Sequence, residues 1–204
     1  MDTTQTLTSK QNISLKDIIK SEIKKCRLDP AYFMKKYCYI QHPERGKIPF
    51  SLYDFQENIV IPDLQKYKHN IILKSRQLGI STVVAGYCLW MVLFQRDKTI
   101  RIIATSQETS KNMITKINYM YYGLPRWLRT LTDNTEDNKL SLSFSNGSSV
   151  RALSSTPTSG RSESLSCLIF DECQFFDARI TIKNKITGET KKIKIGELLQ
   201  DDYS

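Results

Sequence analysis

Two short segments far apart in the sequence constrain this chain more than any other feature. Residues 74–82 read Lys-Ser-Arg-Gln-Leu-Gly-Ile-Ser-Thr, and residues 168–172 read Leu-Ile-Phe-Asp-Glu. The first is typical of a phosphate-binding loop, and the second is an apolar strand that ends in two adjacent carboxylates. Such a loop holds phosphates, while such carboxylates hold a metal ion and an attacking water. The pair therefore predicts a core that hydrolyses nucleoside triphosphates.

The loop departs from the usual pattern G-x-x-x-x-G-K-[ST] at two positions. Lys74 stands in place of the first glycine, and Ile80 stands in place of the lysine. Gly79 and Ser81 keep their register, so the tight turn and the hydroxyl that faces a metal are preserved. The flexible stem of Lys74 can still bring its ammonium to the β- and γ-phosphates. The alternative is an ordinary strand–turn–helix connection, which the Asp-Glu pair argues against.

The hydrophobic pattern predicts an α/β fold. The order of its elements, β-α-β-α-ββ-β, predicts a mainly parallel sheet covered by helices, with the ligand at the carboxyl ends of the strands. This is the P-loop NTPase architecture of the RecA-like, ASCE type. The helices are predicted over 13–41 with a break at Pro30, 52–60, 81–94 and 110–122, and the strands over 70–74, 99–105, 140–144, 149–153 (a hairpin that turns at Asn146-Gly147) and 167–170.

Composition fits a soluble intracellular enzyme. The chain has 204 residues, of which 40% are hydrophobic, enough for one core and an appendage. No run reaches the ~18 apolar residues of a membrane span, and the polar start Met-Asp-Thr-Thr-Gln-Thr is unlike a signal peptide. The cysteines are odd in number and lack C-x-x-C spacing, which favours reduced thiols over disulfides or a zinc site. They are Cys26, Cys38, Cys88, Cys167 and Cys173.

The formal net charge of +9 favours a polyanionic partner. Nucleic acid is the leading candidate, because phosphate backbones attract clustered lysine and arginine side chains. A basic surface that is merely solvated is the alternative.

Several segments resemble the ATPase domain of tailed-bacteriophage terminase large subunits, the motors that pump double-stranded DNA into the procapsid. They occur in the family's order between residues 29 and 175. The family also uses phosphate loops with a displaced lysine, which accounts for Lys74. The segments are Asp29-Pro-Ala-Tyr-Phe, Ile40-Gln-His-Pro, Pro49-Phe-Ser-Leu-Tyr-Asp-Phe-Gln, Ser75-Arg-Gln-Leu-Gly, Phe144-Ser-Asn-Gly-Ser-Ser and Ile169-Phe-Asp-Glu-Cys-Gln-Phe.

The resemblance implies a site for ATP. Tyr53 matches an aromatic residue that stacks on the base, and Gln56 matches an amide that reads the adenine edge; simple packing of Tyr53 and Phe55 is the alternative. Lys74 is expected on the β- and γ-phosphates, and Arg76 is expected to sense the γ-phosphate or to lie on the surface. The residues expected to bind the nucleotide are Tyr53, Gln56, Lys74, Ser75, Arg76, Gln77, Leu78, Gly79, Ile80, Ser81 and Thr82.

The resemblance also implies Mg²⁺ and a catalytic carboxylate. Ser81 and Asp171 are expected to hold the ion, and Glu172 is expected to polarise the attacking water. A helix cap that follows a strand is the alternative for this acidic pair. Arg161 lies in a stretch rich in glycine and serine; it is expected to reach the ATP of a neighbouring subunit in a ring, or else to contact DNA phosphate or solvent.

Residues 173–204 do not continue the terminase pattern and look like the N-terminal splicing block of an intein. Its first residue is a cysteine, so the resemblance implies that Cys173 attacks the Glu172 carbonyl in an N-to-S acyl shift. Alternating isoleucines at 180, 182, 193 and 195 predict an exposed hairpin. In the alternative, Cys173 simply continues the terminase strand.

The expected organisation is an N-terminal helical and basic segment over 1–48, a partial terminase ATPase core over 49–172, and an N-terminal fragment of an intein (Hint-like) domain over 173–204. The chain is interpreted as the N-terminal part of an interrupted or split terminase, without the nuclease domain. Implied partners are double-stranded DNA, portal protein, the small terminase subunit, further copies in a ring and a C-terminal intein/terminase half, in the host cell cytoplasm and without a membrane. A helicase-like ATPase and a splicing precursor without motor activity are the alternatives.

Overall fold

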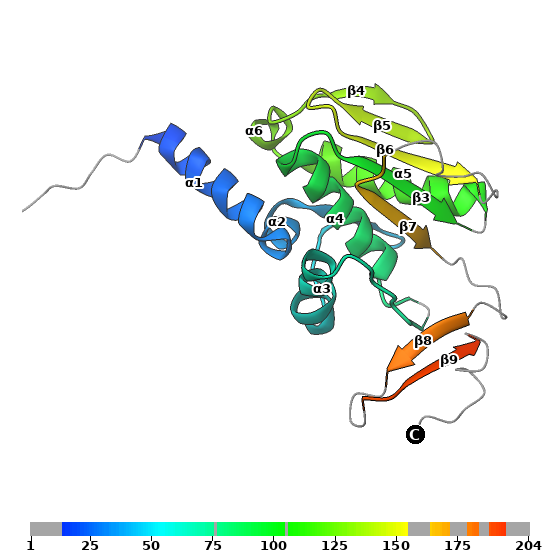
Figure 1. The fold of residues 1–204 in the computed structure, drawn as a ribbon. Coiled ribbons are helices and arrows are strands. Elements are labelled where there is room, and N and C mark those ends of the chain that lie inside the picture. The colour runs from blue at the N-terminus through cyan, green and yellow to red at the C-terminus, as the bar shows by residue number, and fades with distance from the viewer. Residues whose placement is uncertain are drawn as a thin grey trace, which may run out of the picture.

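The computed structural model describes residues 14–75, 77–104, 106–154, 164–171, 179–183 and 188–194. Its centre is a five-stranded sheet with the strand order β4-β5-β6-β3-β7, flanked by helices (Figure 1). The strands are β3 (Thr99–Ala104), β4 (Asn134–Asp137), β5 (Ser141–Phe144), β6 (Ser149–Ser154) and β7 (Cys167–Asp171).

The sheet is mixed rather than mainly parallel. β3 lies between β6 and β7 and is parallel to both, as predicted for a strand in the middle of the sheet. In contrast, β5 is antiparallel to both of its neighbours, β4 and β6. The prediction of a mainly parallel sheet is therefore wrong. The hairpin of β5 and β6 turns at Asn146 and Gly147 as predicted, and it adds antiparallel strands to the parallel part of the same sheet. Gly147 adopts the positive φ of 82° that this turn requires.

Two long helices complete the core. α4 (Ile80–Phe94) is buried around most of its circumference, and α5 (Gln107–Gly123) packs against α4 and against β3, β5 and β6. Both confirm predicted helices. The short α6 (Arg126–Arg129) follows. In the part of the chain that the structure describes, no helix is long and apolar enough to cross a membrane.

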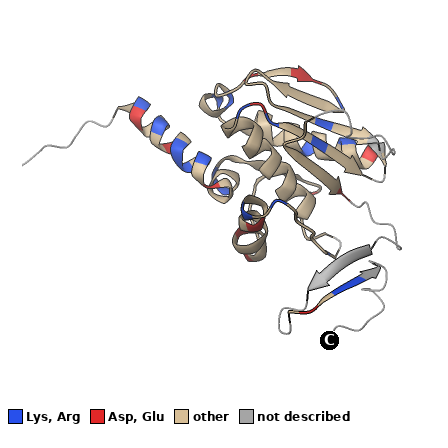
Figure 2. Cartoon of the chain, viewed as in Figure 1, with Lys and Arg blue, Asp and Glu red and all other residues tan. Residues whose placement is uncertain are grey.

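Local capping explains the two N-terminal helices. Ser14 caps α1 (Leu15–Leu28), and Asp29 caps α2 (Pro30–Tyr37), whose first turn contains the proline that breaks the helical pattern as predicted. α1 extends away from the body of the protein (Figure 1). Basic residues follow one another along α1 (Figure 2).

Glu22 ties α1 to α2. Its Oε2 accepts hydrogen bonds from the hydroxyls of Tyr32 and Tyr37 at 2.8 and 2.7 Å, and it also contacts Lys36 Nζ at 2.8 Å. The ion pair with Lys36, followed by the bond from Tyr37, holds the pKa of the Glu22 carboxyl well below its usual range. The carboxylate therefore stays charged and acts as the hub of this junction.

The segment between α2 and the phosphate loop contains elements that the sequence pattern did not separate. β1 (Tyr39–His42) and β2 (Gly46–Pro49) form an antiparallel hairpin, so the helical prediction over 13–41 is wrong for residues 39–41, which pair as a strand after α2 ends at Tyr37. The helix predicted over 52–60 is a π-helix, η1 (Gln56–Val60), that continues into α3 (Ile61–Lys66).

No strand forms over residues 70–74, so the strand predicted to enter the phosphate loop is wrong. Ile71 and Leu73 are 73% and 62% exposed, whereas Ile72 is half-buried. A strand requires a hydrogen-bonded neighbour, and within the described residues the sheet ends at β7, which pairs with β3. Exposed and half-buried side chains alternate over residues 71–74, but in the described part of the chain no neighbouring strand pairs with this segment.

Another hairpin lies near the C-terminus. β8 (Arg179–Lys183) and β9 (Thr190–Lys194) are antiparallel, with Ile180 opposite Ile193. The predicted hairpin is therefore confirmed as a local structure. Ile195 lies outside the described residues.

Candidate functional site

The segment of residues 74–82 and the strand that ends at Asp171 meet at one end of the sheet. Ser81 lies in the first turn of α4, and Asp171 ends β7. The Ser81 hydroxyl donates a hydrogen bond to Asp171 Oδ1 at 3.1 Å across 90 residues of sequence. The register of β7 with β3 pairs Asp171 with Ala104, the last residue of β3. The carboxylate thus sits at the carboxyl ends of parallel strands, where ligands bind in open α/β sheets.

The loop before α4 contains two residues with left-handed backbone. Gln77 has a φ of 64° and Gly79 has a φ of 67°. Glycine tolerates this region, whereas for glutamine it is unusual. The loop reverses here and enters α4 without a side-chain cap from Gly79, whose carbonyl accepts bonds from the amides of Thr82 and Val83 at 3.0 Å. Uncapped amides at the start of a long helix favour an anion.

Gln56 is buried against this loop, with 1% of its surface exposed. Its Nε2 donates to the carbonyl of Leu78 at 2.8 Å, and its Oε1 accepts from the backbone N–H of Tyr53 at 3.0 Å. Both ends of the amide are thus engaged within the protein. Its role in reading adenine stays a prediction.

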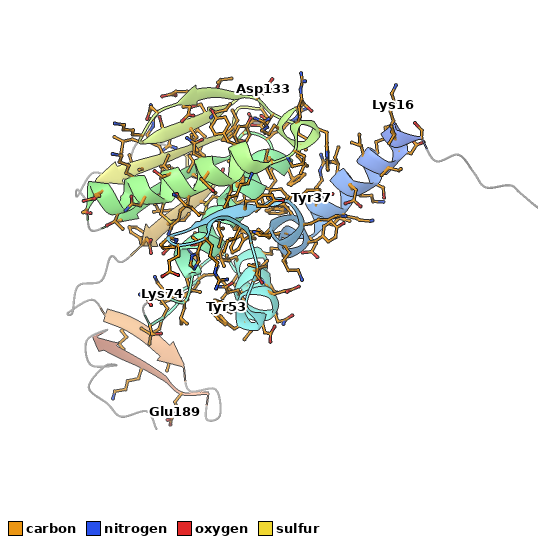
Figure 3. The ribbon with its side chains drawn as sticks, turned by 180° about the vertical axis from the view of Figure 1, so that it is seen from behind. Lys16, Tyr37, Tyr53, Lys74, Asp133 and Glu189 are labelled. Carbon is orange, nitrogen blue, oxygen red and sulfur yellow. The ribbon has the colours of Figure 1, made fainter. Side chains whose placement is uncertain are left out.

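Tyr53 and Lys74 are both accessible beside the loop. Tyr53 is 59% exposed, and its ring stacks on Phe55 with a centroid distance of 5.9 Å and an angle of 10° between the planes. The outer face of the ring is thus open to a flat partner. Lys74 is half-buried, and its side chain lies on the same side of the molecule as Tyr53 (Figure 3).

Residues 71–190 match the protein family described as terminase large subunit, T4likevirus-type, N-terminal. The match covers more than half of the chain. This chain belongs to the terminase large-subunit family. The matched region contains residues 74–82 and Asp171, and it runs past Cys173 to residue 190, so it does not itself mark an interruption after Glu172.

A solved structure supports the same fold. The crystal structure of the HK97 bacteriophage large terminase is similar with a TM-score of 0.56 and 20% sequence identity. The similarity covers 72% of this chain and 31% of that one, so the present chain spans about a third of the length of the HK97 terminase.

Four residues with expected roles lie outside the described part of this terminase chain: Arg76, Arg161, Glu172 and Cys173. The roles assigned to them stay predictions. Of the remaining expected residues, the structure brings Gln56, Gly79, Ser81 and Asp171 into one cluster, through the contacts from Gln56 to Leu78 and from Ser81 to Asp171.

The oxygen atoms of Ser81 and Asp171 suit a small divalent cation. Mg²⁺ is usually held by one or two protein oxygens, with phosphate oxygens and water completing the octahedron. Among the described residues, no group of three or more His, Cys, Asp and Glu side chains could hold a metal by itself. A hydroxyl and a carboxylate therefore fit an ion that arrives with phosphates better than an ion held by protein alone.

The described cysteines are core residues rather than site residues. Cys26, Cys38 and Cys88 are buried, and Cys167 is half-buried on β7. Burial raises the pKa of Cys26 to about 11 and raises the pKa values of Cys38 and Cys88 as well. Thiols in such surroundings remain protonated and unreactive.

Proposed function

We propose that this chain is the ATPase part of a viral DNA-packaging motor, which hydrolyses ATP to move double-stranded DNA into a procapsid. One observation carries the proposal. The hydroxyl of the phosphate loop and the carboxylate at the end of β7 lie within hydrogen-bond distance, Ser81 Oγ to Asp171 Oδ1 at 3.1 Å. In a nucleoside triphosphatase these groups share one Mg²⁺ ion.

The nucleotide would lie across the start of α4. Backbone amides of residues 79–82 would bind its phosphates, and Lys74 would add a positive charge to the β- and γ-phosphates. The rest of the loop around the phosphates would be formed by Ser75, Gln77, Leu78 and Ile80. The exposed ring of Tyr53 would stack on the base.

Mg²⁺ would be held by Ser81 and Asp171, and it would neutralise charge on the phosphates. Glu172 follows Asp171 directly in the sequence and would orient the attacking water. Arg76 and Arg161 would stabilise the charge that develops on the γ-phosphate, Arg161 from a neighbouring subunit or, alternatively, by contacting DNA.

The partners follow from the family. A packaging motor acts on double-stranded DNA, which suits the net charge of +9. Portal protein, the small terminase subunit and further copies in a ring are proposed as the packaging components, with the host cytoplasm as the place of action. Because the chain spans only 31% of the HK97 terminase, nuclease chemistry is not assigned to it. Family membership favours this function over a helicase-like ATPase.

The test is metal-dependent binding of ATP to the 204-residue chain. Asp171→Asn keeps the size of the side chain but removes its charge, so we expect the effect of Mg²⁺ on ATP affinity to fall by at least about tenfold, the scale of one charge-assisted contact. Asp17→Asn, an exposed carboxylate on α1, which extends away from the body of the protein (Figure 1), is the matched control. Equal affinity with and without Mg²⁺ in the unmodified chain would contradict the proposal.

The C-terminal hairpin supports a second function, the start of a protein-splicing domain. β8 and β9 form an antiparallel hairpin, which the resemblance to a splicing block implies, and Cys173 would be the nucleophile. Cys173→Ala should abolish splicing with a C-terminal partner half while leaving ATP binding unchanged. Splicing product from the alanine variant would remove this function.

A further inference from the structure

Gln56 is a buried polar side chain that joins two segments distant in sequence. It belongs to η1, and its amide bridges the backbone of Tyr53 to the backbone of Leu78, 22 residues away. A buried amide is stable only when its donor and acceptor are both satisfied. Here each of them is satisfied by a backbone group, and one of these groups belongs to the phosphate loop.

The loop is pressed closely against this amide. A Cβ placed on Gly79 would lie 3.1 Å from Gln56 Nε2, so the glycine permits the approach. The carbonyl that Gln56 binds belongs to Leu78, which stands between the two left-handed residues Gln77 and Gly79. A backbone of this kind persists only where its surroundings hold it. Gln56 supplies the side-chain hydrogen bond at its centre.

We propose that Gln56 is a positioning residue that holds the phosphate loop in its binding conformation by donating to the Leu78 carbonyl, so that its loss weakens the binding of even a triphosphate without a base. The inference rests on the proposed function of the loop. Loop positioning adds to any reading of the adenine edge and does not replace it, because Nε2 keeps a second N–H and Oε1 keeps a second lone pair beside the two bonds to the backbone.

The same bridge connects the base side of the site to its phosphate side. Tyr53 contributes its backbone N–H to Gln56 Oε1, while its ring stays exposed next to the loop. Gln56 thus contacts both the segment that carries the exposed Tyr53 ring and the loop that precedes α4.

The first experiment separates loop positioning from base reading. Dissociation constants of the 204-residue chain with Mg²⁺ are measured for ATP, GTP and inorganic tripolyphosphate. Gln56→Met keeps the volume of the side chain and removes both hydrogen bonds. We expect tripolyphosphate, which has no base, to bind about tenfold more weakly, the scale of one lost hydrogen bond, and ATP and GTP to lose at least as much affinity. Weaker binding of ATP alone would overturn the inference.

Two further variants sharpen this result. Gln56→Glu keeps an acceptor for the Tyr53 amide and places an oxygen against the Leu78 carbonyl, so it should follow Gln56→Met for all three ligands. Asn58→Ala changes an exposed residue of the same helix and should leave the three constants as they are. Unaltered tripolyphosphate binding in Gln56→Glu would also count against loop positioning.

A second measurement needs no ligand. In amide hydrogen exchange, Gln56→Met should accelerate Thr82 and Val83, whose amides bind the Gly79 carbonyl, and leave α5 protected. Unchanged exchange at these two amides would overturn the inference. If the unmodified chain binds none of the three ligands, the proposed nucleotide site fails, and the exchange result alone decides whether Gln56 holds the loop. If Gln56→Met loses amide protection throughout the chain, the variant has not folded, and the exchange of Thr82 and Val83 is then compared between the unmodified chain and Gln56→Glu.

Discussion

Two parts of the five-stranded sheet differ in how they are held together: the hairpin side, formed by β5 and β6, and the loop side, formed by β7 beside β3. On the hairpin side, β5 and β6 pair through a tight turn, α5 covers them, and Phe144 is 4% exposed. On the loop side, β7 pairs with β3, and Phe170 is 61% exposed. Contacts between neighbours in sequence build the first side, whereas contacts between distant residues build the second. The candidate site therefore belongs to the less covered side.

The largest expected difference comes from truncating one phenylalanine on each side. Phe144 packs edge-on against Tyr121 at 5.5 Å in the core, so Phe144→Ala should lower the free energy of unfolding by about 3–5 kcal/mol. Phe170→Ala should change it by less than about 0.5 kcal/mol, because the ring is already largely solvated. Urea denaturation measures both. Similar losses in the two variants would remove the distinction between the sides.

Two asparagines give the next comparison. Asn146 Nδ2 donates to the carbonyls of Val92 and Gln95 at 2.7 and 3.0 Å, and its Oδ1 accepts from Ser148 N at 3.0 Å. Asn146→Ala should cost about 2 kcal/mol of unfolding free energy, since several bonds are lost. Asn70→Ala removes one exposed bond to Tyr67 and should cost less than about 0.5 kcal/mol. A loss in Asn70→Ala as large as in Asn146→Ala would show that the segment before the loop is held more firmly than its contacts indicate.

Two substitutions in the loop before α4 should have different effects on the free energy of unfolding. Gly79→Ala puts a Cβ on a left-handed residue and 3.1 Å from Gln56 Nε2, so it should destabilise the chain by about 1–2 kcal/mol. Gln77→Gly relieves a left-handed glutamine and should be neutral or stabilising, by less than about 1 kcal/mol. Thermal denaturation distinguishes them. Equal shifts of the same sign would mean that the loop has another backbone conformation in solution.

The smallest expected effect concerns pH and the junction between α1 and α2. The pKa of Glu22 is lowered by the ion pair with Lys36 and by the bonds from Tyr37, Lys25 and Tyr32. A lowered pKa means that the stabilisation is complete above the pKa of the unfolded chain, near ~4.3, and is lost progressively as pH falls from there through the lower pKa of the folded carboxyl. Glu22→Gln should therefore lower the melting temperature slightly at pH 7 and by less at acidic pH. The same deficit at both pH values would assign the effect to packing.

Local signals in the sequence predicted the local structure. Pro30 after a capping aspartate marked the break between α1 and α2, Asn146-Gly147 marked the hairpin, and the β-branched run over 99–105 marked the central strand. Each of these depends on residues that are neighbours in the chain, whose preferences are written in the sequence.

Partners that are distant in sequence could not be predicted in the same way. The alternation over residues 70–74 looks like a strand, but pairing depends on a neighbour that the pattern does not name. The contact from Gln56 to Leu78 spans 22 residues, so no local signal marks it. Ser81 and Asp171 were expected to hold one Mg²⁺ ion, and this expectation brought them together although their spacing in the sequence alone gives no hint; the structure shows the hydrogen bond between them.

The outer edge of β7 has a consequence for handling the protein. In the described part of the sheet this strand pairs on one side, with β3, and Leu168 and Phe170 are 40% and 61% exposed. Open strand edges with apolar side chains are templates for strands of other molecules. Concentrated solutions of the chain should therefore become turbid by edge-to-edge growth, and a charged residue in place of Phe170 should raise solubility without altering the core.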